Sequence, residues 1–213
     1  MEKEYRPVKR IAVILLVALL CVSLLPVGTA AEGPTPVPEE AKYVDFDDMS
    51  FWVNGEKFTL GVTTLQDMID AGVVFDAVDL EDADNNLRKN TQSETFKFYI
   101  TEHLYGLVKV MNDTDKGKRL ADCPLRRLYV TLSDHPEELD TSILTMAFPL
   151  DLTLAQLAEH AGEPDDKSHY DGSKYVSDTY TYQKSGRRYF GYNEFSFTFH
   201  DGVLDYFSID YIP

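Results

Sequence analysis

The sequence predicts an α+β fold made of two tandem units, each with a short helix packed on one face of an antiparallel sheet. A helix-like phrase occurs twice: residues 64–72 read TLQDMIDAG and residues 153–162 read TLAQLAEHAG. Runs that alternate apolar and polar residues follow each phrase, which is typical of half-buried strands. We therefore expect a first helix-and-sheet unit at residues 46–135 and a second at 141–213.

The first 31 residues predict a secretory signal peptide. Basic residues precede an unbroken apolar run at residues 11–25, and small residues follow at 27–31. Segments of these kinds in this order direct export, with cleavage after Ala30 or Ala31. The apolar run is shorter than the roughly 20 residues that a membrane-spanning helix needs. We expect a secreted or cell-surface protein outside the cytoplasmic membrane, held at the membrane only if the N-terminal segment is not cleaved.

Residues 32–45 predict a Pro-rich, acidic linker. The whole chain has a formal net charge of −16, and removing residues 1–31 takes four basic and two acidic residues, which leaves −18. Such a polyanion repels nucleic acid and anionic lipid, so binding by phosphate neutralisation is excluded. Only Cys123 survives processing, so the fold depends on its apolar core rather than on a disulfide. This cysteine usage fits export from a Gram-positive bacterium.

The first unit begins with a predicted hairpin at residues 51–60, because Asn54-Gly55 is a strong two-residue turn signal between apolar arms. The helix follows, with Thr64 as N-cap and Asp67 placed as in a capping box. Gly72 stands where a left-handed C-terminal cap is needed.

An acidic loop at residues 76–90 and a set of strands complete the first unit. Strands are predicted at residues 95–100, 105–112 and 125–132. In the last of these, Leu128, Val130 and Leu132 alternate with polar residues and are expected to face the core. The polar segment at residues 133–140 is the predicted boundary between the units.

The second unit repeats the order of helix and sheet. Thr153 and Gln156 are placed as a capping box, and residues 164–173 form a loop. A three-stranded meander is predicted at residues 174–183, 193–200 and 203–211.

The last hairpin has two candidate registers. A two-residue turn at Asp201-Gly202 pairs Phe199 with Leu204 and divides the apolar residues between both faces. A three-residue loop with Gly202 in the left-handed conformation pairs Phe199 with Val203 instead. We predict this bulged register, because a sheet covered on one side should have one apolar face. That face would hold Phe195, Phe197, Phe199, Val203, Phe207 and Ile209.

The second unit resembles a known module. The residues that carry the resemblance are 148–157, 162–165, 180–182 and 200–202. They are similar to the unit of the SmpA/OmlA outer-membrane assembly lipoproteins and, as a tandem pair, to the β-lactamase inhibitor protein fold. Asp151 departs from the Gly usual in the lipoproteins, and the lipid-bearing Cys is missing.

The first unit, at residues 53–60 and 112–123, is similar to uncharacterised secreted proteins of Firmicutes. The two resemblances imply a non-enzymatic module that binds another protein through an exposed sheet face.

Metal binding has one candidate segment. Asp82-x-Asp84-x-Asn86 opens like a calcium loop, but Leu87 occupies the required Gly position and Ser93 the required Glu position. A solvated acidic loop is the expected state, and the residues alone leave calcium binding open. We predict no metal site and no cofactor.

The sequence shows no catalytic constellation, so we expect no enzyme and no catalytic residues. A hydrolase is the less favoured alternative, because Glu159, Asp165 and Asp166 show no paired arrangement across a cleft. Cys123 follows an aspartate, which raises rather than lowers a thiol pKa. We expect this cysteine to be packed in the core.

The aromatic residues carry the functional prediction. The chain has 13 Tyr and 12 Phe, and residues 187–193 read RRYFGYN, an aromatic and basic loop in an acidic chain. Tyr and Arg are enriched where protein interfaces concentrate their binding energy. We therefore predict an extracellular protein partner, with a cell-wall or glycan-binding module as the alternative because aromatic faces also stack on sugars. The predicted partner-binding residues are Tyr180, Tyr182, Arg187, Arg188, Tyr189, Tyr192 and Tyr206.

Overall fold

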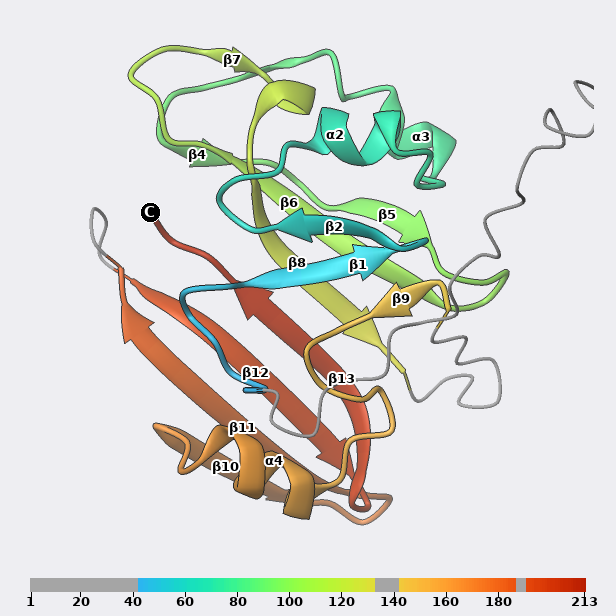
Figure 1. The fold of residues 1–213 in the computed structure, drawn as a ribbon, viewed down its shortest axis with the longest axis vertical. Helices are drawn as coiled ribbons and strands as arrows, with labels where there is room; N and C mark the ends of the chain where they lie inside the picture. The colour runs from blue at the N-terminus through green and yellow to red at the C-terminus, as the bar shows by residue number, and fades with distance from the viewer. Residues whose placement is uncertain (1–41, 133–141, 187–190) are drawn as a thin grey trace, which may run out of the picture. The chain divides into compact units, whose positions relative to one another are not determined.

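Antiparallel sheets dominate the structure, a computed structural model that describes residues 42–132, 142–186 and 191–213 (Figure 1). Its elements are β1 (Ser50–Val53), β2 (Glu56–Thr59), α2 (Leu65–Asp70), α3 (Ala77–Leu80), β3 (Asn86–Leu87), β4 (Thr91–Gln92), β5 (Phe96–Tyr99), β6 (Tyr105–Asn112), β7 (Lys118–Arg119), the 3₁₀ helix η1 (Leu120–Asp122), β8 (Leu125–Thr131), β9 (Leu144–Thr145), α4 (Leu154–Ala161), β10 (Asp166–Asp171), β11 (Val176–Ser185), β12 (Tyr192–His200) and β13 (Val203–Asp210). This mixture of short helices with antiparallel strands is compatible with the α+β class.

One large sheet runs through both halves of the chain. Its strand order is β10-β11-β12-β13-β8-β6-β4, and β5 pairs with β6 as well. A three-stranded sheet, β2-β1-β9, and a two-stranded sheet, β3-β7, accompany it. The pairings β8–β13 and β1–β9 join strands from either side of the predicted boundary, which itself lies outside the described residues. The described residues accordingly belong to one compact unit.

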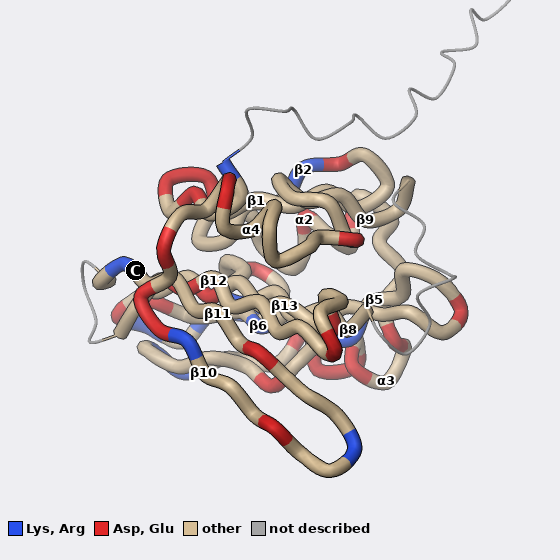
Figure 2. The backbone as a smooth tube through the Cα atoms, turned by 90° about the horizontal axis from the view of Figure 1, so that it is seen from below, with Lys and Arg blue, Asp and Glu red and all other residues tan. Residues whose placement is uncertain are grey.

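The core lies between the large sheet and the elements on one side of it. Helix α4 and the β2-β1-β9 sheet lie on the same side of the large sheet (Figure 1, Figure 2). Phe148 fills the space between the layers, with its ring centroid 5.0 Å from those of both Phe197 and Phe207. Leu128, Val130 and Leu132 point into this core as predicted.

The folded part begins earlier than the predicted linker boundary at residue 45. Tyr43 and Val44 are buried. The Tyr43 ring stacks on His160 in the last turn of α4, with 4.5 Å between ring centroids. The end of the predicted linker is therefore part of the core. The predicted signal peptide lies outside the described residues.

Helices α2 and α4 both begin with the predicted capping boxes. The Thr64 side chain accepts a hydrogen bond from the Asp67 N–H, and the Asp67 side chain accepts one from the Thr64 N–H. Thr153 and Gln156 make the same reciprocal pair in α4. These bonds satisfy N–H groups that the first turn of a helix leaves without partners.

We expect Thr64→Ala and Thr153→Ala each to lower the free energy of unfolding by about 1 kcal/mol. The matched variants Thr64→Ser and Thr153→Ser keep a hydroxyl acceptor and should stay close to the parent protein. Urea unfolding of the four variants measures the difference. Equal stability of an alanine variant and its serine counterpart would show that the cap contributes nothing.

The predicted register of the last hairpin is wrong at the turn. The turn has two residues, Asp201 and Gly202, both with positive φ, and Phe199 pairs with Leu204 rather than with Val203. A bulge at Asp205 then shifts the register by one residue. The apolar face forms as expected, but with Leu204 buried in it and Val203 65% exposed.

Candidate functional site

The side of the large sheet that points away from the core is the candidate functional site, and we call it the open face. Successive side chains of a strand point to opposite faces of a sheet. Residues that alternate with the buried ones therefore define the open face. It carries an aromatic pair, a corner where a lysine lies over two tyrosines, an ion-pair cluster, a strip of small hydroxyl side chains and a second aromatic group.

Tyr129 and Tyr206 form an aromatic pair on the open face. They come from the neighbouring strands β8 and β13, where Thr131 pairs with Tyr206 and Tyr129 pairs with Ser208. Their ring centroids are 5.4 Å apart and both residues are partly buried. Leu107 continues the row, because it pairs with Tyr129 on the next strand. Two central strands thus hold this aromatic pair in place.

Lys97 extends the open face toward the end of the sheet formed by β5. Its Nζ lies 4.8 Å from the ring centroid of Tyr99 and 4.2 Å from that of Tyr105. The Tyr99 hydroxyl donates a hydrogen bond to Asp76, the N-cap residue of α3, and this bond holds the pKa of the Asp76 carboxyl below its usual value. The corner is therefore cationic and aromatic, with its tyrosine tied to α3.

A bulge in β8 brings two consecutive arginines to one carboxylate. Arg127 pairs with Lys109 but Leu125 pairs with Val110, which leaves Arg126 as the extra residue. Arg126 Nη1 lies 2.6 Å from Asp210 Oδ1, and Arg127 Nε lies 2.7 Å from the same oxygen. Simple alternation would direct adjacent side chains to opposite faces, so the bulge is what allows both guanidinium groups to reach Asp210.

Small hydroxyl side chains lie on this side of β11, β12 and β13, and Thr198 among them is only 1% exposed. Thr179 and Thr198 are paired across β11 and β12, and their Oγ1 atoms share a hydrogen bond of 2.9 Å. The other members of the strip are Ser177, Thr181, Ser196 and Ser208.

A second aromatic group lies beyond the hydroxyl strip. The Tyr175 ring centroid is 5.5 Å from that of Tyr170 and 4.2 Å from that of His200, the latter at a perpendicular angle. Tyr170 is 57% exposed and Tyr175 43% exposed. The open face thus has large aromatic side chains at both ends of a strip of small hydroxyl side chains.

The predicted partner-binding tyrosines divide between the two faces. Tyr206 lies on the open face, and Tyr192 is exposed at the start of β12. Tyr180 and Tyr182 pair with Phe197 and Phe195, so both point to the core side of the sheet; Tyr182 is a core residue, and Tyr180 is partly buried against the core. Arg187, Arg188 and Tyr189 lie outside the described residues.

Tyr182 shows why the prediction fails for β11. Its side chain is 4% exposed, its hydroxyl donates to the Gly162 carbonyl, and burial raises its pKa to about 12. Tyr180 is half-buried and makes an edge contact with Phe199. Both rings point to the core side of the sheet, and only Tyr182 is fully enclosed there.

Sequence reasoning missed five aromatic residues of the open face, which are Tyr99, Tyr105, Tyr129, Tyr170 and Tyr175. The alternation in residues 125–132 already directed Tyr129 away from the core. What it could not show was that β8 lies next to β13, because this pairing joins segments far apart in the chain.

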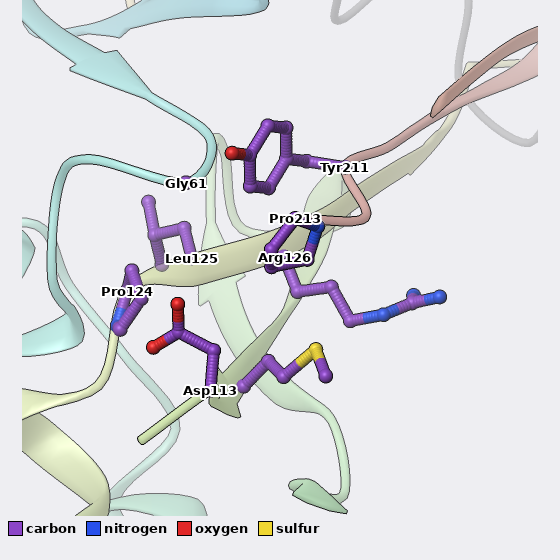
Figure 3. A pocket seen from close by; sticks show the side chains of 8 residues that line it. Gly61, Asp113, Pro124, Leu125, Arg126, Tyr211 and Pro213 are labelled. Atoms are coloured by element: carbon purple, nitrogen blue, oxygen red, sulfur yellow. The ribbon is translucent and has the colours of Figure 1, made fainter. Parts of the chain in front are cut away.

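A shallow depression lies at one end of β8 (Figure 3). Its empty volume is about 260 Å³, including open solvent. The Tyr211 ring closes one wall by lying over Gly61, whose φ of +78° and lack of a Cβ allow this approach. It is lined by Gly61, Met111, Asp113, Pro124, Leu125, Arg126, Tyr211 and Pro213. This lining pairs no nucleophile with a base.

The acidic segment with calcium-loop spacing makes contacts within the protein. Asp84 forms an ion pair with Arg119 at 2.8 Å, and Asp82 accepts a hydrogen bond from Asn85. Within the described ranges, no group of three or more His, Cys, Asp or Glu side chains is placed to hold a metal ion.

Cys123 lies outside the open face. Cys123 is fully buried, as predicted, and burial raises its thiol pKa to about 11.

In the part of the chain that the structure describes, no helix has both the length and the apolar character needed to cross a membrane.

Comparison with known proteins gives no match to a family model, to a curated protein or to a solved structure.

Proposed function

We propose that this chain is a secreted, non-enzymatic binding protein that presents the open face of its sheet to an extracellular protein. The observation that carries the proposal is the Tyr129–Tyr206 pair, two partly exposed rings 5.4 Å apart on the side of the sheet away from the core. Tyr is enriched among the residues that dominate binding energy, because a rigid amphipathic ring buries a large area at little cost in entropy.

The neighbours of the pair support a protein partner. Lys97 and Arg127 supply positive charge on a chain whose formal net charge is −16. Leu107 adds an apolar side chain beside Tyr129. A cluster of aromatic, apolar and basic groups on paired strands offers a preorganised surface to a partner with acidic side chains.

The tandem layout belongs to the same proposal. We propose that residues 46–135 and 141–213 are two copies of one helix-and-sheet unit, joined edge to edge through β8 and β13. The capping boxes at Thr64 and Thr153 support this reading, as does the order of a helix followed by antiparallel strands in each half. Joining the sheets would double the area of the open face relative to one unit.

Capture experiments test the proposed function. The immobilised protein is incubated with culture supernatant and cell-wall extract, and the enriched protein is then titrated against purified variants. We expect Tyr129→Ala/Tyr206→Ala to weaken binding about 30-fold or more, which corresponds to the roughly 2 kcal/mol of an interface hot spot. Arg188→Ala tests the basic loop in the same assay.

The matched control is Tyr180→Ala, because Tyr180 points to the core side of the sheet. It should leave the affinity for the partner unchanged once its folding is checked by circular dichroism. A partner that binds Tyr129→Ala/Tyr206→Ala as tightly as the parent protein would contradict the assignment of the open face.

A glycan is the second candidate ligand, favoured by Tyr170 and Tyr175 beside the hydroxyl strip. Exposed rings can stack on sugar faces, and hydroxyl groups can hydrogen-bond to sugar hydroxyls. Binding to purified peptidoglycan that persists at high salt and is lost in Tyr170→Ala/Tyr175→Ala would support it. Retention of that binding in the double variant would remove the glycan site from this corner.

A further inference from the structure

Strand β10 is a free edge of the large sheet. It pairs with β11 through all six of its residues and with no other strand among the described residues. All six residues are exposed. At the other end of the sheet, the segment before α3 covers the edge of β5, because the Asp76 N–H donates to the Lys97 carbonyl and the Tyr99 N–H donates to the Val74 carbonyl. An uncovered edge strand can pair with another chain.

The hydrogen-bond pattern shows which groups of β10 point outward. The Gly172 N–H donates to the Tyr175 carbonyl at the end of the β10–β11 hairpin. Backbone groups of alternate residues point to opposite sides of a strand. Tyr170, Ser168 and Asp166 therefore bond to β11. The backbone groups of Lys167, His169 and Asp171 point away from the sheet.

We propose that β10 pairs antiparallel with β10 of a second copy of this chain, with His169 opposite His169 on the two-fold axis. An antiparallel pair forms hydrogen bonds only where outward-pointing residues lie opposite each other. This register alone places all three outward-pointing residues of one copy opposite those of the other. The dimer joins two large sheets into one.

Charge complementarity selects the same register. It places Lys167 of each copy opposite Asp171 of the other, and opposite charges in directly opposed positions stabilise a strand pair. The two His169 side chains meet at the axis, and each brings its own carboxylate, because Nδ1 of His169 lies 2.7 Å from Oδ1 of Asp178. A shift of the register by two residues in either direction loses both Lys–Asp pairs.

A cysteine at the axis gives the sharpest test. Residues opposite each other in a hydrogen-bonded antiparallel pair have Cα atoms about 5.5 Å apart, which a disulfide can bridge. We expect His169→Cys, made together with Cys21→Ser, to form a covalent dimer within minutes in oxidised glutathione. The remaining Cys123 is fully buried and should not react. The matched control, Ser168→Cys, lies opposite Tyr170 and should cross-link at least tenfold more slowly.

Sedimentation of the protein without added cysteines tests the charge pairs. We expect a dimer whose population rises with concentration. Lys167→Asp should weaken it about tenfold or more, and Lys167→Asp/Asp171→Lys should restore it. Each variant should keep the circular dichroism of the parent.

Several outcomes would overturn the proposal. A protein that stays monomeric to about 0.5 mM, or equal cross-linking of His169→Cys and Ser168→Cys, would do so. A dimer that Lys167→Asp leaves unchanged would place the interface elsewhere. Incorporation of an added extended peptide at β10 in place of a second copy would show that the edge serves a different partner.

Discussion

The Phe148→Ala variant is expected to lose about 3–5 kcal/mol of unfolding free energy. Phe148 is fully buried and lies outside the regular elements, in the segment between β9 and α4. Its ring makes edge contacts with Phe197 and Phe207 of the large sheet and with Tyr43 of the N-terminal segment. Alanine would leave a cavity between the layers that the paired strands cannot collapse to fill.

This loss is large in relation to the 5–15 kcal/mol that stabilise a typical domain. We expect the transition to remain cooperative, because the described residues belong to one compact unit. Chemical denaturation followed by tryptophan fluorescence measures the loss, since Trp52 lies in β1 of the same core layer. A fall in the denaturation midpoint with an unchanged slope is the expected pattern.

Val203→Ala is the matched control for cavity formation. It also removes apolar atoms from a residue near the core, but Val203 is 65% exposed at the hairpin turn. The change should stay within about 0.5 kcal/mol of the parent. If Phe148→Ala lowers the unfolding free energy no more than this control does, the segment between β9 and α4 does not hold the layers together.

The sequence predicts the local structure of this chain better than its long-range pairing. The capping boxes and the Asn54-Gly55 turn are coded by neighbouring residues, so they could be placed in advance, whereas the two-residue turn at Asp201-Gly202 was predicted wrongly. The pairing of β8 with β13 depends on packing across the whole chain. Without it, the strands of the two halves could not be assembled into one sheet.

Bulges limit what the sequence pattern can predict about the face a side chain takes. Alternation predicts which face a side chain takes only while the strand stays regular. The two-residue turn pairs Leu204 with Phe199 and so buries it, and the bulge at Asp205 then returns Phe207 to the same face, while the bulge at Arg126 brings two adjacent arginines together. Tyr180 and Tyr182 were predicted to bind a partner from their residue type, whereas the pairing of β11 with β12 places them beside Phe197 and Phe195.

The Asp210→Asn variant is expected to lose about 3 kcal/mol of unfolding free energy, because it removes the charge that two arginines share. Asp210 is 6% exposed, whereas the side chains of Arg126 and Arg127 are 15% and 41% exposed. Asparagine keeps the shape of the side chain and one acceptor oxygen. The loss should therefore report the uncompensated charge of Arg126, which has little access to water.

The two arginines should differ in the effect of their removal. Arg127→Gln should cost less than about 1 kcal/mol, because a guanidinium with this exposure is partly solvated and Arg126 still neutralises Asp210. The loss of unfolding free energy for Arg126→Gln should be intermediate, because Asp210 then keeps only Arg127, its more exposed partner. The expected order of destabilisation is Asp210→Asn, then Arg126→Gln, then Arg127→Gln.

Glu163→Gln provides the matched control, since its ion pair with Lys167 has side chains that are largely exposed. That change should shift the unfolding free energy by no more than about 0.5 kcal/mol. Urea unfolding of all four variants at neutral pH gives the comparison. If Asp210→Asn is no more destabilising than Glu163→Gln, the guanidinium groups find water or other acceptors when the carboxylate is lost, and the bulge at Arg126 is not stabilised by this ion-pair cluster.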